Sequence, residues 1–193
     1  MLETVLLASL LAQDVFVEGN PRAAVRVLIY DEVQSSECAG FQIMLDTYLL
    51  PKYKDKVAFE RRDFPLPKHP WSRRAAVAAR HFDHVRPGAG GDFRRYVFER
   101  LRSTDTETLD ERIREFARQE GLDPIDAMRA AGSPELEAAV DKDYKEGTAR
   151  GVSKTPTVYI GEKAFVERFG RAQITDAIDR ALALEATEPS AKR

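Results

Sequence analysis

The chain has 193 residues, 43% of them hydrophobic, and its 30 basic residues nearly balance its 32 acidic ones. This balance gives no overall positive charge that would favour nucleic acids or an anionic membrane surface, so a nucleic acid is not an expected partner. The single cysteine excludes an intramolecular disulfide and a zinc site built from several thiolates, and it leaves the redox compartment unspecified.

Residues 1–18 are expected to form an N-terminal helix or arm that packs its leucines on the domain. The apolar run from Val5 to Ala12 is too short for a membrane span, which takes about 20 residues. A secretory signal begins with basic residues, whereas Glu3 is the only charge before this run. An atypical signal, or its remnant, is the second interpretation of this segment.

Residues 19–66 follow a strand, helix, strand pattern. The segment AVRVLIYD, residues 24–31, is apolar on both faces, which is typical of a central strand. From Cys38 onward apolar residues recur three and four apart, which predicts a helix stopped by Pro51. A second strand is predicted from Val57 to Arg62, and such a unit normally makes a right-handed parallel crossover.

The rest of the chain divides into three parts. The capping residues and helix-ending glycines in residues 67–150 are typical of consecutive helices, and they predict an all-helical insertion. Residues 151–184 predict two short strands, 157–160 and 163–166, and a last amphipathic helix. Residues 185–193 are expected to be a flexible tail. The order βαβ, helices, ββα predicts an α/β thioredoxin fold with a helical insertion between its halves.

Several motifs in this order resemble the DsbA-like thiol–disulfide oxidoreductases of the thioredoxin superfamily. They are VLIYDEVQSSEC at the first strand and loop, RRDFPLPKHPW after the second strand, GVSKTPTVYIG before the third, and FGRAQITDAID near the end. The family has a Cys-x-x-Cys motif at a helix N-terminus, where this chain has Ser35, Ser36, Glu37 and Cys38. The resemblance implies that Ser35 holds the place of the attacking cysteine and Cys38 that of the resolving one.

Serine at position 35 rules out exchange through two cysteines, because a hydroxyl stays protonated at neutral pH and forms no disulfide. Three explanations remain open. The serine replaces a natural cysteine; or the serine is natural and the protein keeps a peptide-binding groove or a one-thiol role; or Ser35 is a working hydroxyl. The last case is similar to kappa-class glutathione transferases, in which a serine at this place binds the glutathione thiolate.

Thr155 and Pro156 form the other half of the expected site. In the family this proline is cis and faces the cysteine loop, and the residue before it offers its backbone to an extended substrate. Asp31, Glu32 and Glu37 would each raise the pKa of a nearby thiol, but a solvated acidic loop is the favoured interpretation. Ile29 occupies the position where some relatives bury a proton-relaying carboxylate, so that relay is absent or comes from another residue.

The resemblance implies thiol–disulfide exchange with protein or peptide thiols, or with glutathione in the alternative, and no metal or organic cofactor. The three histidines, His69, His81 and His84, lack a further ligand set, and no metal site is predicted. Arg62, Asp63 and Pro65 are expected to be structural. The family location is periplasmic or otherwise extracytoplasmic, whereas the lack of a clear signal favours the cytoplasm.

Overall fold

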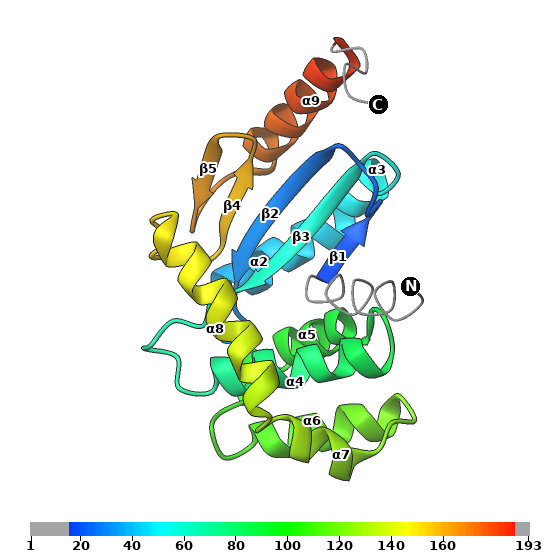
Figure 1. The fold of residues 1–193 in the computed structure, drawn as a ribbon, viewed down its shortest axis with the longest axis vertical. Coiled ribbons are helices and arrows are strands. Elements are labelled where there is room, and N and C mark those ends of the chain that lie inside the picture. The colour runs from blue at the N-terminus through cyan, green and yellow to red at the C-terminus, as the bar shows by residue number, and fades with distance from the viewer. Residues whose placement is uncertain (1–15, 188–193) are drawn as a thin grey trace, which may run out of the picture.

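A five-stranded mixed sheet lies at the centre of the molecule (Figure 1). The computed structural model describes residues 16–187, so the expectations for residues 1–15 and 188–193 lie outside the described part. The strands are β1 (Phe16–Gly19), β2 (Val25–Asp31), β3 (Val57–Asp63), β4 (Thr157–Ile160) and β5 (Lys163–Val166). Their spatial order is β1-β3-β2-β4-β5, with only the β2–β3 pair parallel. The predicted strands and the parallel crossover are therefore confirmed.

Strand β1 corrects the interpretation of residues 16–18, which we assigned to an N-terminal helix or arm. These residues pair antiparallel with β3, in the register Phe16 with Arg61 and Gly19 with Ala58. The strand has only four residues and is half-buried, so its own pattern of apolar residues is too short to reveal it. Its partner strand β3 supplies the hydrogen bonds that define it.

The helix after β2 continues past Pro51, against expectation. It runs as α2 (Ser36–Met44), a π-helical stretch (Leu45–Leu49) and α3 (Leu50–Tyr53). Pro51 lies in the first turn of α3, directly after the π-helical stretch. In that stretch the Leu50 amide bonds to Leu45, five residues earlier. In a regular α-helix the proline ring would clash with the carbonyl four residues earlier, and that carbonyl would lose its hydrogen bond. The wider π-helical turn avoids this break.

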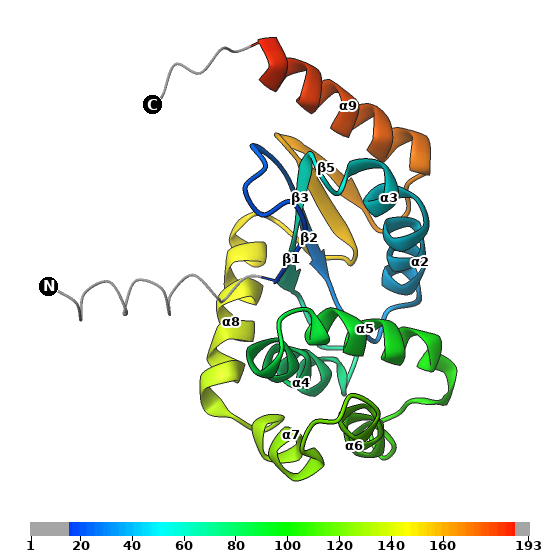
Figure 2. The same ribbon diagram turned by 90° about the vertical axis from the view of Figure 1, so that its right-hand side faces the viewer.

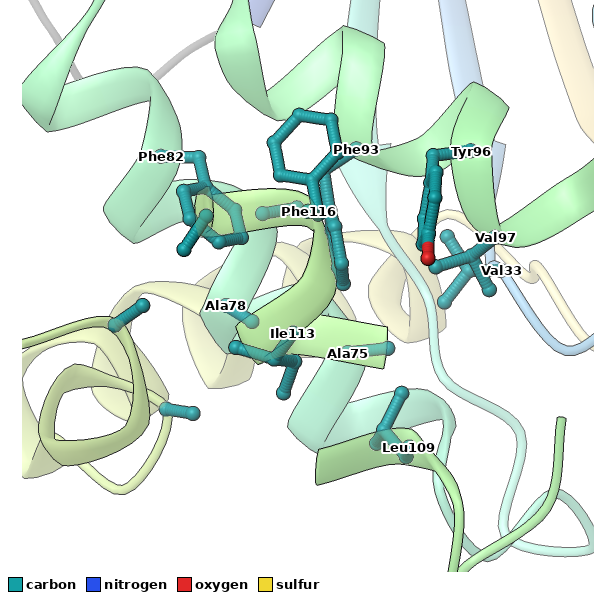
Figure 3. Close-up of a cluster of buried hydrophobic side chains, with 14 of the residues drawn as sticks. Val33, Ala75, Ala78, Phe82, Phe93, Tyr96, Val97, Leu109, Ile113 and Phe116 are labelled. Atoms are coloured by element: carbon teal, nitrogen blue, oxygen red, sulfur yellow. The ribbon is translucent and has the colours of Figure 1, made fainter. Parts of the chain in front are cut away.

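The inserted helices form a layer with its own apolar core. They are α4 (Ser72–Val85), α5 (Ala89–Glu99), α6 (Leu109–Gln119), α7 (Pro124–Ala130) and α8 (Pro134–Ala149), with a short 3-10 turn (Leu101–Ser103) after α5. Phe82, Phe93 and Phe116 meet at its centre, with ring centroids 4.8–5.2 Å apart (Figure 3). Val33 reaches this core from the loop after β2, so the helical layer is packed directly against the candidate site.

Helices cover both faces of the sheet (Figure 2). Helices α2, α3 and α9 (Arg171–Thr187) pack on one face, where Phe41, Leu45 and Ile174 meet the strands. Helix α8 covers the other face close to Tyr30 and Phe64. Because α9 extends to Thr187, residues 185–187 are helical and do not belong to a flexible tail. The thioredoxin fold with helices between its two halves is confirmed.

A buried ionic network joins the sheet to the helices. Asp63, at the end of β3, accepts from Arg94 at 2.7 Å and from Arg80 at 2.6 Å, and its backbone amide donates to Asp143 at 2.9 Å. Asp63 and Arg94 are each 2% exposed. Paired buried charges of this kind are expensive to break, so Asp63 has the structural role expected for it. Among residues 16–187 no helix is both long enough and apolar enough to cross a membrane.

Candidate active site

Ser35 caps the N-terminus of α2 at the end of the β2 loop. Its backbone is extended (φ −107°, ψ 125°), and its Oγ accepts a hydrogen bond from the Cys38 amide at 3.2 Å. This satisfies one of the amides that a helix leaves unpaired at its N-terminus. In this bond the Ser35 hydroxyl oxygen acts as the acceptor.

Cys38 lies one turn further into α2 and is completely buried. Burial raises the pKa of its thiol strongly, and the nearby Asp31 carboxylate raises it further. Hydrogen bonding from Ser35, from the Glu32 backbone and from Thr155 lowers the pKa but does not offset the burial. In this state Cys38 is a neutral, shielded thiol.

Two of the three acidic loop residues are buried, which corrects the interpretation of a solvated loop. Asp31 is 1% exposed and forms an ion pair with Arg61, whose guanidinium also donates to Gln42 at 2.6 Å. Glu32 is 2% exposed. Only Glu37 is partly exposed, 3.4 Å from Arg168. The sequence gives no sign of this burial, because the arginine that pairs with Asp31 comes from the neighbouring strand.

Thr155 and Pro156 lie opposite this loop and are joined by a cis peptide bond. The Thr155 hydroxyl donates to Glu32 Oε1 at 3.1 Å, and it also contributes to the environment of the Cys38 thiol. No hydrogen bond of the Thr155 backbone occurs within the described residues. The fold therefore brings all four predicted site residues to one place, although some 120 residues separate the two pairs in the chain.

An open groove of about 580 Å³ runs along the site. Its walls come from the start of α2, the loop after β3, the loop before β4 and the end of β5. The lining residues are Gln34, Ser35, Ser36, Glu37, Leu66, Pro67, Lys68, His69, Ser153, Lys154, Thr155 and Glu167. Lysine and glutamate side chains both line it, so the groove is polar and mixed in charge.

His69 is the residue that sequence reasoning missed. Its Nδ1 lies 2.6 Å from Glu32 Oε1, and its side chain, 22% exposed, lines the groove. The only sequence signal was its place just beyond the second strand, which does not reveal the contact. His81 lies elsewhere, 3.5 Å from Asp126. The described residues contain no cluster of three or more metal-ligating side chains.

In this geometry the Ser-x-x-Cys turn at the start of α2 and the cis-proline loop lie at the same place in the fold. A family model described as thioredoxin matches residues 12–180. The chain therefore belongs to the thioredoxin family. A search of curated proteins finds no match to it.

Solved structures with the same fold include DsbA-like proteins. Oxidised BdbD from Bacillus subtilis is 20% identical with a TM-score of 0.78, over 89% of this chain and 94% of BdbD. A cysteine-to-alanine variant of alpha-DsbA1 from Wolbachia pipientis is 18% identical with a TM-score of 0.76, over 89% and 92% of the two chains. A periplasmic thioredoxin-like protein from Salmonella enterica serovar Typhimurium is 19% identical with a TM-score of 0.74, over 89% and 91%.

Proposed function

We propose that this protein is a DsbA-like thiol–disulfide oxidoreductase in architecture, whose groove binds extended segments of cysteine-containing proteins. With serine at position 35 it binds such segments without completing dithiol exchange. The observation that carries the proposal is that Ser35 lines the groove, whereas Cys38, whose amide donates to Ser35 Oγ, is fully buried and does not line it. A substrate sulfur approaching along the groove reaches position 35 before Cys38.

The Thr155 edge supports binding of an extended peptide. Its backbone N–H and C=O are without hydrogen bonds among residues 16–187, and Thr155 lines the groove beside Ser35. An extended segment can pair with such an edge through main-chain hydrogen bonds and gain affinity without requiring a particular sequence. The substrate cysteine would then lie next to position 35.

Restoring the attacking sulfur tests this proposal. The Ser35→Cys variant is expected to reduce insulin with dithiothreitol as the electron donor, because a thiol at the N-terminus of α2 is stabilised as thiolate by the helix. The unsubstituted chain and the double variant Ser35→Cys/Cys38→Ala are expected to show no turnover above the uncatalysed rate. If Ser35→Cys also fails to turn over while it remains folded, the groove is a binding site only.

A titration of the native thiol tests the role given to Cys38. Because this side chain is fully buried and its pKa is raised, an aromatic disulfide reagent is expected to react with it only after unfolding in urea. Rapid stoichiometric reaction in the native protein would contradict the shielding and would support a one-thiol role for Cys38.

The Ser35 hydroxyl makes glutathione a second candidate ligand. Ser35 lines the groove, its Oγ accepts from the Cys38 amide, and a hydroxyl can donate its proton to a thiolate bound beside it. A glutathione-dependent transferase would bind glutathione saturably, and Ser35→Ala would weaken that binding. Calorimetry that shows no heat of binding at millimolar glutathione would remove this candidate and leave the protein-binding proposal intact.

A further inference from the structure

A small cavity lies between the sheet and the inserted helices, apart from the groove of the candidate active site. Its volume is about 20 Å³, which is room for one water molecule or one monatomic ion. Its walls come from β1, β3, α4 and α5, and the lining residues are Phe16, Arg61, Asp63, Arg80, Asp83, His84 and Arg94. None of these residues lines the groove, so the cavity is a separate place in the fold.

Two buried arginines on the cavity wall have donor nitrogens without an acceptor. Arg61 is 4% exposed and Arg94 is 2% exposed. Arg61 donates from its terminal nitrogens to Asp31 and Gln42, but its Nε has no hydrogen bond within the described part of the chain. Arg94 donates to Asp63 at 2.7 Å, and its Nε and Nη1 also lack a partner there. Because a buried donor without an acceptor is costly, three of them at one cavity point to a ligand.

The carboxylates at the cavity are already engaged. Asp63 accepts hydrogen bonds from two arginines. Asp83 Oδ1 accepts from the backbone amides of Gly88 at 3.1 Å and Gly90 at 2.9 Å. Within the described residues, the buried side-chain atoms of the cavity wall that lack a partner are therefore all donors. A ligand that only accepts hydrogen bonds fits this set better than water, which must also place two protons.

The charges on the cavity wall favour an anion. The charged side chains that line it are three arginines and two aspartates, namely Arg61, Arg80, Arg94, Asp63 and Asp83. Two further carboxylates pair with these arginines, Asp31 with Arg61 and Asp143 with Arg80, but neither of them lines the cavity. The wall itself therefore presents more positive than negative charge to a bound group.

We propose that this cavity is a chloride site that joins β3 to α5. Chloride accepts from Arg61 Nε and from Arg94 Nε and Nη1, and the small volume excludes polyatomic anions such as phosphate or sulfate. Arg61 also holds Asp31 at the end of β2, so the anion lies behind the candidate active site. The inference goes beyond the proposed function and does not depend on it, because no residue of the groove takes part.

Bromide in place of chloride locates the anion. Crystals of the unsubstituted chain soaked in sodium bromide and measured at the bromine absorption edge are expected to show an anomalous peak in the cavity. This peak should lie within hydrogen-bond distance of Arg61 Nε and of the unpartnered nitrogens of Arg94. An ordered water at this place without anomalous signal, or bromide on the outer surface only, would overturn the proposal.

Broadening of the ³⁵Cl resonance at pH 7 measures chloride binding in solution. Arg94→Lys keeps a positive charge beside Asp63 but removes the two unpartnered nitrogens of Arg94. It is expected to weaken chloride binding by roughly tenfold or more, the scale of one lost hydrogen bond to a charged group.

Arg62→Lys is the matched control for this variant. Arg62 Nη1 is also buried without a partner among the described residues, but Arg62 does not line the cavity, so this variant is expected to bind chloride like the unsubstituted chain. Equal broadening in all three proteins would contradict the chloride site. If Arg94→Lys does not fold, the bromide measurement on the unsubstituted chain still decides.

Discussion

Replacing Ser35 with alanine removes the cap of α2 and so separates the structural role of this serine from its chemistry. The lost bond is the 3.2 Å contact from the Cys38 amide to Ser35 Oγ, at a position that is 4% exposed. Loss of a serine cap costs about 1 kcal/mol, and a buried amide left without a partner moves the cost toward about 2 kcal/mol. We therefore expect the free energy of unfolding to fall by about 1–2 kcal/mol.

Urea denaturation followed by circular dichroism measures this change. With a urea dependence of about 2 kcal/mol per molar, the midpoint is expected to fall by about 0.5–1 M. Ser36→Ala is the matched control, since Ser36 is exposed and, among residues 16–187, its hydroxyl donates to the partly exposed Glu37 carboxylate and not to a helix amide. If both variants unfold at the same midpoint, Ser35 does not hold the helix end. Sulfur is a weaker acceptor than oxygen, so Ser35→Cys is expected to lose part of the same stability.

Two further predictions concern the layer between the sheet and the inserted helices. A Cβ at Gly147 would come within 2.7 Å of Phe64 and 2.9 Å of Tyr30, so Gly147→Ala is expected to lower the free energy of unfolding by about 1–2 kcal/mol. Gly40 lies in α2 with open space around it, so Gly40→Ala should raise the free energy of unfolding or leave it unchanged. Equal changes in the two variants would contradict the close approach of α8 to Phe64 and Tyr30. Burial and the charge of Asp63 raise the pKa of Asp143 to about 6, so folding takes up a proton and stability should fall as pH rises from about 4 to about 6. In urea unfolding across that pH range, the free energy of unfolding of Asp143→Asn should fall less than that of the unsubstituted chain. If the two free energies depend on pH equally, the pH dependence comes from other groups.

The local elements of this protein were predictable because their signals are local. The buried run of β2, the two short strands at residues 157–160 and 163–166, and the capped helices of the insertion each carry their pattern within a few residues. Pro51 was misread because a helix that widens into a π-helical turn tolerates a proline, and nothing in the sequence marks that turn. Strand β1 was missed because a four-residue edge strand is defined by its neighbour.

The order of the elements and the pair of loops that make the site can be predicted without the structure. Ser35 and Cys38 are one helical turn apart, and the Thr155–Pro156 motif stands directly before a strand, so the family pattern could be read from them. The environment of these residues is set by the packing of the folded chain. The burial of Asp31 depends on Arg61 from the adjacent strand, and the contact of His69 with Glu32 joins residues 37 apart. Burial and pairing of charges depend on partners distant in the chain, which no local pattern records.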